Sequence, residues 1–120
     1  MTIQKFTQLT AWKESHKLVL LTYQTTNRFP AKEKFVLVPQ MNRCVISISS
    51  NIAEGFTRQG NKEKIQFYYM AKASLTELEN QLIIANDLGY VSKDNFQLLT
   101  KQFELVGKLI TGLIRSIKSR

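Results

Sequence analysis

The sequence has few of the residues that staple small proteins together or interrupt helices. Its 120 residues include one cysteine, two prolines and five glycines. The single cysteine, Cys44, cannot form an intrachain disulfide, so the chain must rely on one hydrophobic core, which a chain of this length can supply. Scarce cysteine also agrees with a reducing cytoplasm, where we expect the protein.

Long apolar runs are also missing. No run approaches the roughly 20 residues that a membrane-crossing helix needs. The start, MTIQKFTQLT, lacks the charged, apolar and small-residue order of a secretory signal. We therefore expect a soluble, intracellular protein. No repeat or low-complexity segment divides the chain, so residues 1–120 are predicted to form one domain.

Residues suited to catalysis or metal binding are sparse. Cys44 would need the only histidine, His16, as its base, and both lie beside apolar stripes, where a packing role is expected. Glu77 and Glu79 are two residues apart and point to different sides of a helix, so they form no carboxylate cage. The sequence predicts no enzyme activity, no metal site and no cofactor.

One charge sign dominates. Lysine and arginine number 17 against 9 acidic residues, for a net charge of +8 at pH 7. This excess favours polyanionic partners, with nucleic acid first and an anionic membrane surface second. The aliphatic residues of the basic last helix are spaced for packing in a bundle, so we expect no membrane partner. The charge is uneven along the chain, because no acid opposes the basic residues that follow Glu104.

Apolar residues recur at steps of three and four in four segments, which predicts four helices. We place them at residues 8–27, 36–54, 61–87 and 92–118. Short connections between long helices favour an all-α, antiparallel up-down four-helix bundle.

The expected buried stripes follow from this spacing. They are Leu9, Trp12, His16, Val19 and Tyr23; Met41, Val45, Ile48 and Ile52; Phe67, Ala71, Leu75, Leu78, Leu82 and Ala85; and Phe96, Leu99, Phe103, Val106, Ile110, Leu113 and Ile117. A second apolar set widens the last stripe, so this helix should contact more than one neighbour: Leu98, Leu105, Leu109 and Ile114.

Four residues mark the expected helix ends. Pro39 suits a first turn or a kink of the second helix, and Gly55 suits its C-terminal cap. Asn61 and Ser92 are the expected N-caps of the third and fourth helices.

The outer side of the second helix carries small residues where a solvated face normally carries long charged ones. Arg43 is the only charged residue from Met41 to Ala53. Two interpretations remain open: this side packs on a second subunit, or the helix lies in the middle of its own bundle. The residues concerned are Arg43, Ser47, Ser50, Asn51, Glu54 and Gly55. We expect Asn51 to bond to a neighbouring chain or to the following loop.

A longer pattern resembles a known bacterial family. The central box runs from Gln40 to Arg43 and from Ser47 to Phe56, with Arg58 after it. Further matches are Phe6, Leu9 and Trp12, then Phe29 and Pro30, the stretch from Ser74 to Glu79, and Gly89 with Tyr90. The chain is similar to the four-helix-bundle proteins encoded in intervening sequences of large-subunit ribosomal RNA genes, relatives of the accessory variability proteins of diversity-generating retroelements.

The resemblance implies a bundle that assembles into a cyclic homo-oligomer, with a pentamer as the best-known form, and no enzyme activity. In the retroelement branch it also implies nucleic-acid binding and a reverse transcriptase partner, whereas this chain is more similar to the ribosomal branch. The pattern is broken at Pro39, Cys44 and Ser49, which affects the fine geometry of the second helix.

Basic residues are the candidates for phosphate contacts. The first group surrounds the start of the third helix, where free amides favour anions, and comprises Arg58, Lys62 and Lys64. The second recurs every seven residues on the fourth helix and continues to its end: Lys101, Lys108, Arg115, Lys118 and Arg120. An alternative interpretation is that the first group belongs to a solvated loop and the second to a solvated face of the fourth helix. Tyr68 and Tyr69 could stack on bases, although helix packing also explains them.

The sequence thus predicts a cytoplasmic, non-enzymatic homo-oligomer that binds RNA or DNA through phosphates and without base-specific readout. The alternative is an oligomeric scaffold that docks a protein partner such as a reverse transcriptase.

Overall fold

The computed structural model describes residues 2–120, and within them the chain is all-α and has no strand. Four long helices dominate: α1 (Thr10–Thr26), α2 (Leu37–Thr57), α3 (Asn61–Asp87) and α4 (Lys93–Lys118). Two short 3₁₀ helices, η1 (Phe6–Gln8) and η2 (Ala31–Glu33), precede α1 and α2. The prediction of an all-α chain with four helices is confirmed.

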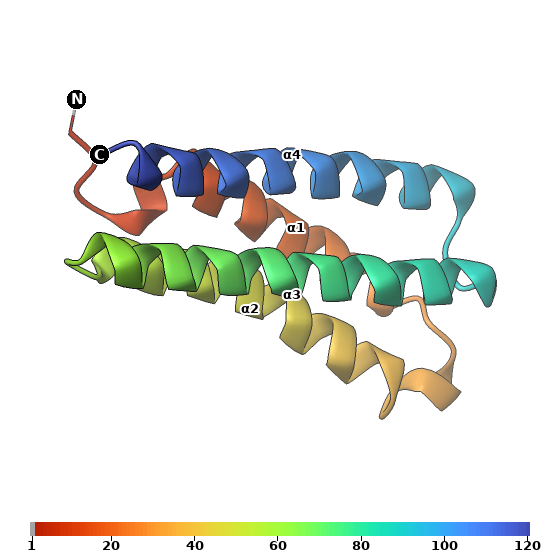
Figure 1. The fold of residues 1–120 in the computed structure, drawn as a ribbon. Coiled ribbons are helices and arrows are strands. Elements are labelled where there is room, and N and C mark those ends of the chain that lie inside the picture. Colours follow the sequence, from red (N-terminus) through yellow and green to blue (C-terminus); the bar gives the residue numbers. More distant parts are fainter. Residues whose placement is uncertain (1) are drawn as a thin grey trace.

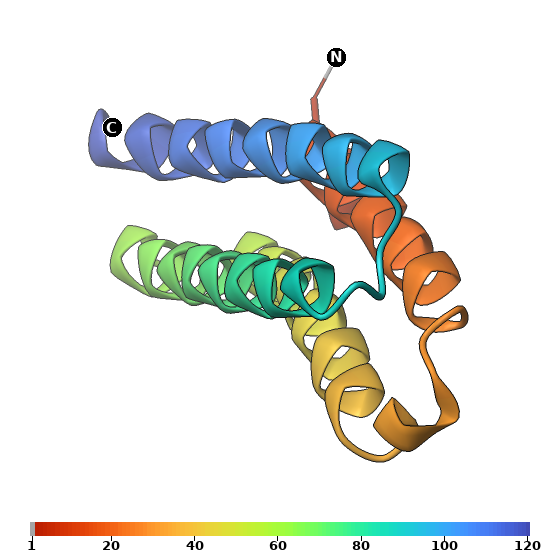
Figure 2. The ribbon, with the colours of Figure 1, turned by 90° about the vertical axis from the view of Figure 1, so that its right-hand side faces the viewer.

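The helices form a compact body of 46 × 25 × 20 Å. Helix α1 packs on α2 and α4, and α3 packs on the same two helices. The α1–α2 and α3–α4 connections lie at one end, and the α2–α3 connection lies at the other (Figure 1). Seen from the end, α1 and α4 lie on one side and α2 and α3 on the other (Figure 2).

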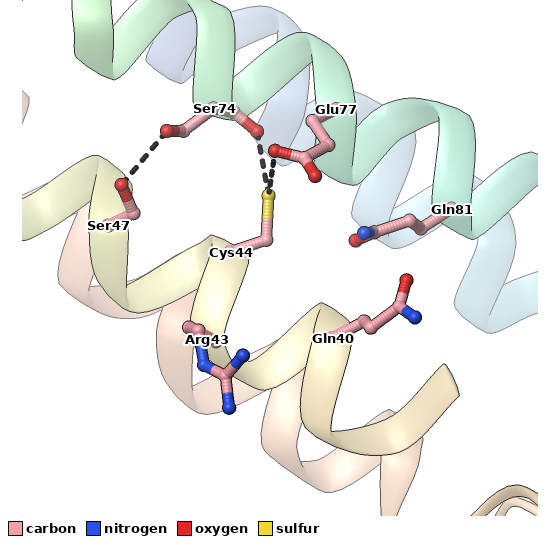
Figure 3. A pocket seen from close by; sticks show the side chains of 7 residues that line it. All are labelled: Gln40, Arg43, Cys44, Ser47, Ser74, Glu77 and Gln81. Atoms are coloured by element: carbon pink, nitrogen blue, oxygen red, sulfur yellow. Dashed lines mark hydrogen bonds between the residues drawn. The ribbon is translucent and has the colours of Figure 1, made fainter. Parts of the chain in front are cut away.

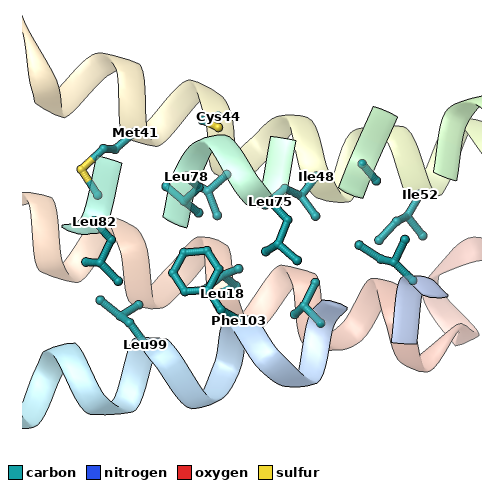
Figure 4. Packing of buried hydrophobic residues seen from close by; sticks show 14 of the residues in the cluster. Leu18, Met41, Cys44, Ile48, Ile52, Leu75, Leu78, Leu82, Leu99 and Phe103 are labelled. Carbon is teal, nitrogen blue, oxygen red and sulfur yellow. The ribbon is translucent and has the colours of Figure 1, made fainter. Parts of the chain in front are cut away.

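The core runs along the space between the four helices (Figure 4). Leu18, Ile48, Leu78 and Leu99, one from each helix, are almost completely buried. Most of the stripes predicted for α2, α3 and α4 are buried as expected. The exceptions are Phe67, Phe96 and Leu113, which are half-buried, while the neighbouring Tyr68 and Ile114 are buried.

The stripe predicted for α1 is wrong by about one residue. His16 and Tyr23 are exposed, and Leu9, Trp12 and Val19 only flank the core. The buried side of the helix instead carries small and hydroxyl residues around one leucine: Ala11, Ser15, Leu18, Thr22 and Thr25.

Hydrogen bonds satisfy hydroxyl groups on this buried side of α1. Ser15 Oγ donates to the carbonyl of Ala11 at 2.7 Å, one turn earlier in the same helix. Thr25 Oγ1 donates to Leu21 at 2.8 Å and accepts from Asn95 Nδ2 of α4 at 2.7 Å. Because a hydroxyl can use its own helix as a partner, it need not remain in water.

The expected caps are partly right. Ser92 Oγ accepts from the amide of Asn95 at 3.1 Å, which confirms it as the N-cap of α4. Pro39 is the third residue of α2 and therefore lies in its first turn. Asn61 is not an N-cap, because Gly60 occupies that position and Asn61 is already helical.

The prediction that Gly55 caps the second helix is wrong. Helix α2 continues to Thr57, and Gly55 is a buried helical residue. Its role is to let α3 approach: a Cβ at Gly55 would lie 2.7 Å from Tyr68 Cε1 and 3.0 Å from Phe67 Cβ. Only glycine fits without displacing the Tyr68 ring.

The glycine that ends a helix is Gly89, with a φ of 82°. The amide of Gly89 donates to Asn86 and that of Tyr90 to Ala85, each at 3.0 Å, which is a Schellman motif. Tyr90 Oη then donates to Glu33 Oε2 of η2 at 2.8 Å. These contacts tie together the two connections at this end of the molecule.

We predict that Gly55→Ala lowers the free energy of unfolding by about 1 kcal/mol or more. Overpacking against Tyr68 should exceed the gain of up to about 1 kcal/mol from helix propensity. The matched control is Gly112→Ala in α4, where no atom lies within 4 Å of the added Cβ and stability should rise. Chemical denaturation measures both, and a stabilised Gly55→Ala variant would refute the close approach.

Candidate nucleic-acid interface

A groove between α3 and α4 collects basic side chains. Two adjoining hollows, of about 220 and 470 Å³, share Lys72, Thr111 and Arg115 in their walls. We call their combined surface the basic groove and define it by Tyr69, Lys72, Lys108, Thr111, Arg115 and Lys118.

Small residues on α4 create this hollow. Gly107 and Gly112 both border it, and Thr111 lies between them. A Cβ at Gly107 would lie 3.5 Å from Leu75 Cδ2, so the side chain of Leu75 from α3 packs directly against the α4 backbone here. The longer basic side chains on either side then form the rims.

The cations of the groove are not neutralised by the chain itself. Within residues 2–120 the one ion pair joins Lys17 Nζ to Glu14 Oε1, 3.7 Å apart, on α1. Glu104 also borders the groove, yet it forms no ion pair within 4.0 Å with a described cation. The groove is therefore a site of net positive charge open to an anion.

An aromatic ring lies at the end of the groove. Tyr69 is 45% exposed, and Lys118 Nζ donates to its hydroxyl at 2.8 Å. The same ammonium lies 5.4 Å from the ring centroid, within the range of a cation–π contact. Tyr68, by contrast, is buried, so helix packing explains it.

The structure brings together Lys108, Arg115 and Lys118 of the predicted stripe, whereas Lys101 does not border the groove. Arg120 lies beyond its end. The positive charge of Arg120 is the second cause, after burial, that lowers the pKa of Lys64. Positive charge thus extends from the groove toward the α2–α3 connection.

Lys64 is not a free phosphate contact. Its Nζ donates to the carbonyl of Phe56 at 2.7 Å and to that of Gly55 at 3.4 Å. Carbonyls in the last turn of a helix lack intrahelical partners and carry partial negative charge. Lys64 therefore caps the C-terminus of α2.

The other two residues of that group remain at the surface. The guanidinium of Arg58 lies over the ring of Phe67, with its carbon 4.7 Å from the centroid. Lys62 is exposed on the first turn of α3. Neither borders the basic groove.

Sequence reasoning missed Lys72. It lies three residues after Tyr69 and therefore on the same side of α3. A search for basic periodicity confined to one helix cannot find it, because its partners Lys108 and Arg115 lie on α4. The signal that could have identified Lys72 is its spacing of three residues from Tyr69, which places a basic and an aromatic side chain on one side of a helix.

The second helix uses its polar residues inside the chain. Ser47 Oγ lies 2.9 Å from Ser74 Oγ of α3. Asn51 Nδ2 donates to the carbonyl and hydroxyl of Ser47 at 2.8 and 3.1 Å. The prediction that Asn51 bonds to the following loop is wrong, because the preceding turn of its own helix supplies the partners.

The remaining residues of that face point outward. Arg43, Ser50 and Glu54 are exposed, and Ile46 beside them is 42% exposed. The face thus divides into an inner part against α3, which holds Ser47, and an outer part that no helix of the same chain covers.

His16 and Cys44 occupy separate packing environments. The imidazole of His16 is exposed and stacks on Trp12, with centroids 5.0 Å apart. Cys44 Sγ is buried and donates to the carbonyl of Ser74 at 3.1 Å. Burial and then the charge of Glu77 raise the pKa of Cys44 to about 12, so the thiol is neutral at pH 7.

No three His, Cys, Asp or Glu side chains in residues 2–120 are grouped so that they could hold a metal ion. None of the helices in the same range is both long and apolar enough to cross a membrane.

Comparisons with known proteins agree with this fold. A family model described as 23S rRNA-intervening sequence protein matches residues 7–112, which confirms the resemblance. A solved structure from Bacteroides thetaiotaomicron, described as a protein of unknown function from the S23 ribosomal protein family, is similar with a TM-score of 0.80 and 20% identity. The match covers 88% of this chain and 95% of that one. A comparison with curated proteins finds no match.

We predict that Lys64→Met lowers the free energy of unfolding by about 1 kcal/mol, because the last carbonyls of α2 lose a charged donor. Lys62→Met removes the same charge two residues earlier without removing a cap and should leave stability nearly unchanged. Thermal unfolding of the two variants makes the comparison. Equal melting temperatures would show that Lys64 does not cap α2.

Proposed function

Because the chain belongs to the 23S rRNA-intervening sequence protein family, we propose that it is a non-enzymatic protein that binds nucleic acid, RNA or DNA, through phosphate contacts in the basic groove. The observation that carries the proposal is the set of cations along α3 and α4 without ion pairs in the described chain. Phosphates would replace the missing counter-charges.

The dimensions of the groove support a backbone contact. The basic residues on α4 extend from Lys108 to Lys118, which spans about 15 Å at 1.5 Å per helical residue. Each strand of a duplex has one phosphate per about 3.4 Å of the duplex axis, so a groove of this length parallel to the axis spans the rise of roughly four phosphates. Tyr69 at one end offers a ring on which an unpaired base can stack.

Recognition should not depend on base sequence. The sequence carries no recognised helix-turn-helix, zinc-finger or RNA-binding-sheet signature that would direct side chains to base edges. Lysine and arginine contacts to phosphate position a nucleic acid and carry no sequence information. We therefore propose binding that weakens steeply with salt and discriminates little between sequences.

We further propose that the chain is an antiparallel up-down bundle that assembles in the cytoplasm into a cyclic homo-oligomer, with the pentamer as the expected form. Apolar side chains that no helix of the chain covers support assembly: Ile46, Ile83, Ile84, Leu88, Leu98 and Leu105. A ring would also repeat the basic groove around its circumference and so strengthen the attraction for a polyanion.

The same exposed apolar side chains favour one alternative, an oligomeric scaffold that docks a protein partner such as a reverse transcriptase. Recovery from cells after nuclease treatment separates the two functions. A protein partner remains attached after the nucleic acid is digested, whereas a partner tethered by nucleic acid is lost.

We predict that Lys72→Gln combined with Arg115→Gln weakens binding of a labelled single-stranded RNA about tenfold or more. The slope of log K against log salt should become shallower by about 1.4, because two phosphate contacts are lost at about 0.7 each. Fluorescence anisotropy between about 50 and 200 mM salt measures both quantities. A single-stranded DNA of the same sequence tests the preference between RNA and DNA.

Lys101→Gln is the matched control for this experiment. It removes a cation from the same stripe of α4 but from outside the groove, so binding should change less than with either groove substitution. A wild-type affinity that is independent of salt would contradict the proposed function.

We predict that native mass spectrometry of the nuclease-treated protein shows a whole multiple of the chain mass, with five chains as the expected number. Ile46→Arg should reduce this mass, because it places a charge on the outer face of α2. Gln24→Arg on α1, where the side chain is exposed and polar, is the control and should leave the mass unchanged. A monomer at micromolar concentration would exclude the assembly.

A further inference from the structure

Another hollow, of about 430 Å³, lies between α2 and α3, away from the basic groove, and its lining is mostly polar. Figure 3 shows Cys44 of α2 directed toward Ser74 and Glu77 of α3 at its centre. We call this hollow the polar pocket. No step of the proposed nucleic-acid binding uses it.

The strongest feature of the pocket is a buried amide without a partner. Gln81 is only 6% exposed, and its Oε1 is buried with no hydrogen-bond donor among the described residues. Figure 3 shows its side chain extending from α3 into the space between the helices, with Gln40 directed toward it from α2. A buried carbonyl without a donor lowers stability, so leucine would be the better residue if packing were its only purpose.

The second feature is a carboxylate without a cation. Glu77 borders the pocket, and no Lys, Arg or His of the described chain lies within 4.0 Å of it. Arg43 also borders the pocket, but Figure 3 shows its guanidinium directed away from Glu77. Gln81 and Glu77 lie one turn apart on α3 and therefore face the same space.

Several donors inside the pocket are already engaged. The thiol of Cys44 is directed at the carbonyl of Ser74, 3.1 Å away, and lies 3.6 Å from Glu77 Oε2. The hydroxyls of Ser47 and Ser74 bond to each other at 2.9 Å. The pocket is thus bordered by an uncharged acceptor, the enclosed Oε1 of Gln81, and by a negative one, the exposed carboxylate of Glu77. A group with several N–H donors would satisfy both once a rotation of the Gln81 amide turns its oxygen toward the space.

We propose that the polar pocket binds a guanidinium or primary ammonium group, which donates to Gln81 Oε1 and pairs with the carboxylate of Glu77. The group belongs either to a free small molecule or to an arginine or lysine side chain of a second copy of the chain. An anion is disfavoured by Glu77. A soft metal ion would need the thiolate of Cys44, which burial keeps protonated.

The test uses agmatine, an alkyl guanidinium, and the single cysteine as a reporter. Cys44 lines the pocket, so an occupant should slow its alkylation by iodoacetamide. At a dissociation constant of about 10 mM, about 10 mM agmatine fills half the sites and slows the reaction about twofold. The bis-quaternary N,N,N,N′,N′,N′-hexamethyl-1,4-butanediammonium ion has the same charge of +2 without N–H donors and should give no protection.

Substitutions assign the effect to the two acceptors. Glu77→Gln and Gln81→Leu should each abolish the protection by agmatine, expressed as the ratio of rates with and without it. Glu79→Gln is the control, since it removes an exposed charge two residues away and should retain the protection. Without agmatine, Gln81→Leu should melt at the same temperature as wild type or higher, whereas a packing role for the amide would lower it.

Dilution of the protein distinguishes the two possible sources of the cation. If a second copy supplies it, Cys44 alkylation slows as protein concentration rises, and agmatine adds little at high concentration. If a small molecule supplies it, the rate is independent of protein concentration, and agmatine protects throughout. Two results would overturn the proposal. One is a wild-type alkylation rate that neither agmatine nor a higher protein concentration lowers, and the other is protection of the Glu77→Gln variant by agmatine as strong as that of the wild type.

Discussion

The contact between Gly55 of α2 and the ring of Tyr68 of α3 determines much of the remaining structure. Because position 55 has no Cβ, the two helices meet closely near the α2–α3 connection. From this contact α2 and α3 separate toward the N-terminal end of α2, as Figures 1 and 2 both show. The polar pocket lies along this widening interval, and the short connection places Lys64 where it can cap α2.

The hydropathy pattern predicted the buried side of the helices whose core residues are apolar. It failed for α1, whose buried side carries mostly small and hydroxyl residues. In α4 the spacing of Leu99, Phe103 and Val106 is sufficient to identify the core side. In α1 the core side carries Ser15, Thr22 and Thr25, whose hydroxyl groups are invisible to an apolar count. The hydrogen bond from Ser15 to Ala11 lies within one helix. Which side of α1 becomes buried depends instead on the residues that α2 and α4 place against it.

The candidate site was predictable within one helix and not between two. The seven-residue period of Lys108 and Arg115 identified one rim of the basic groove. Lys72 and Tyr69 form the other rim, and only the packing of α3 on α4 reveals that they face those residues. Lys64 shows the converse, because its charge suggested a ligand contact, whereas its distance to the Phe56 carbonyl shows a structural bond. The unpartnered amide of Gln81 likewise depends on tertiary contacts that periodicity does not report.

The near absence of ion pairs has a consequence for how the chain responds to its surroundings. A net charge of +8 with one internal ion pair in residues 2–120 means that the folded state carries electrostatic self-repulsion. Bringing several chains together would add to that repulsion, so added salt or a bound polyanion should favour the assembled state over separate chains. If the proposed function holds, salt would have two opposed effects on this protein: it would compete with phosphates for the groove, and it would screen the charges that keep separate chains apart.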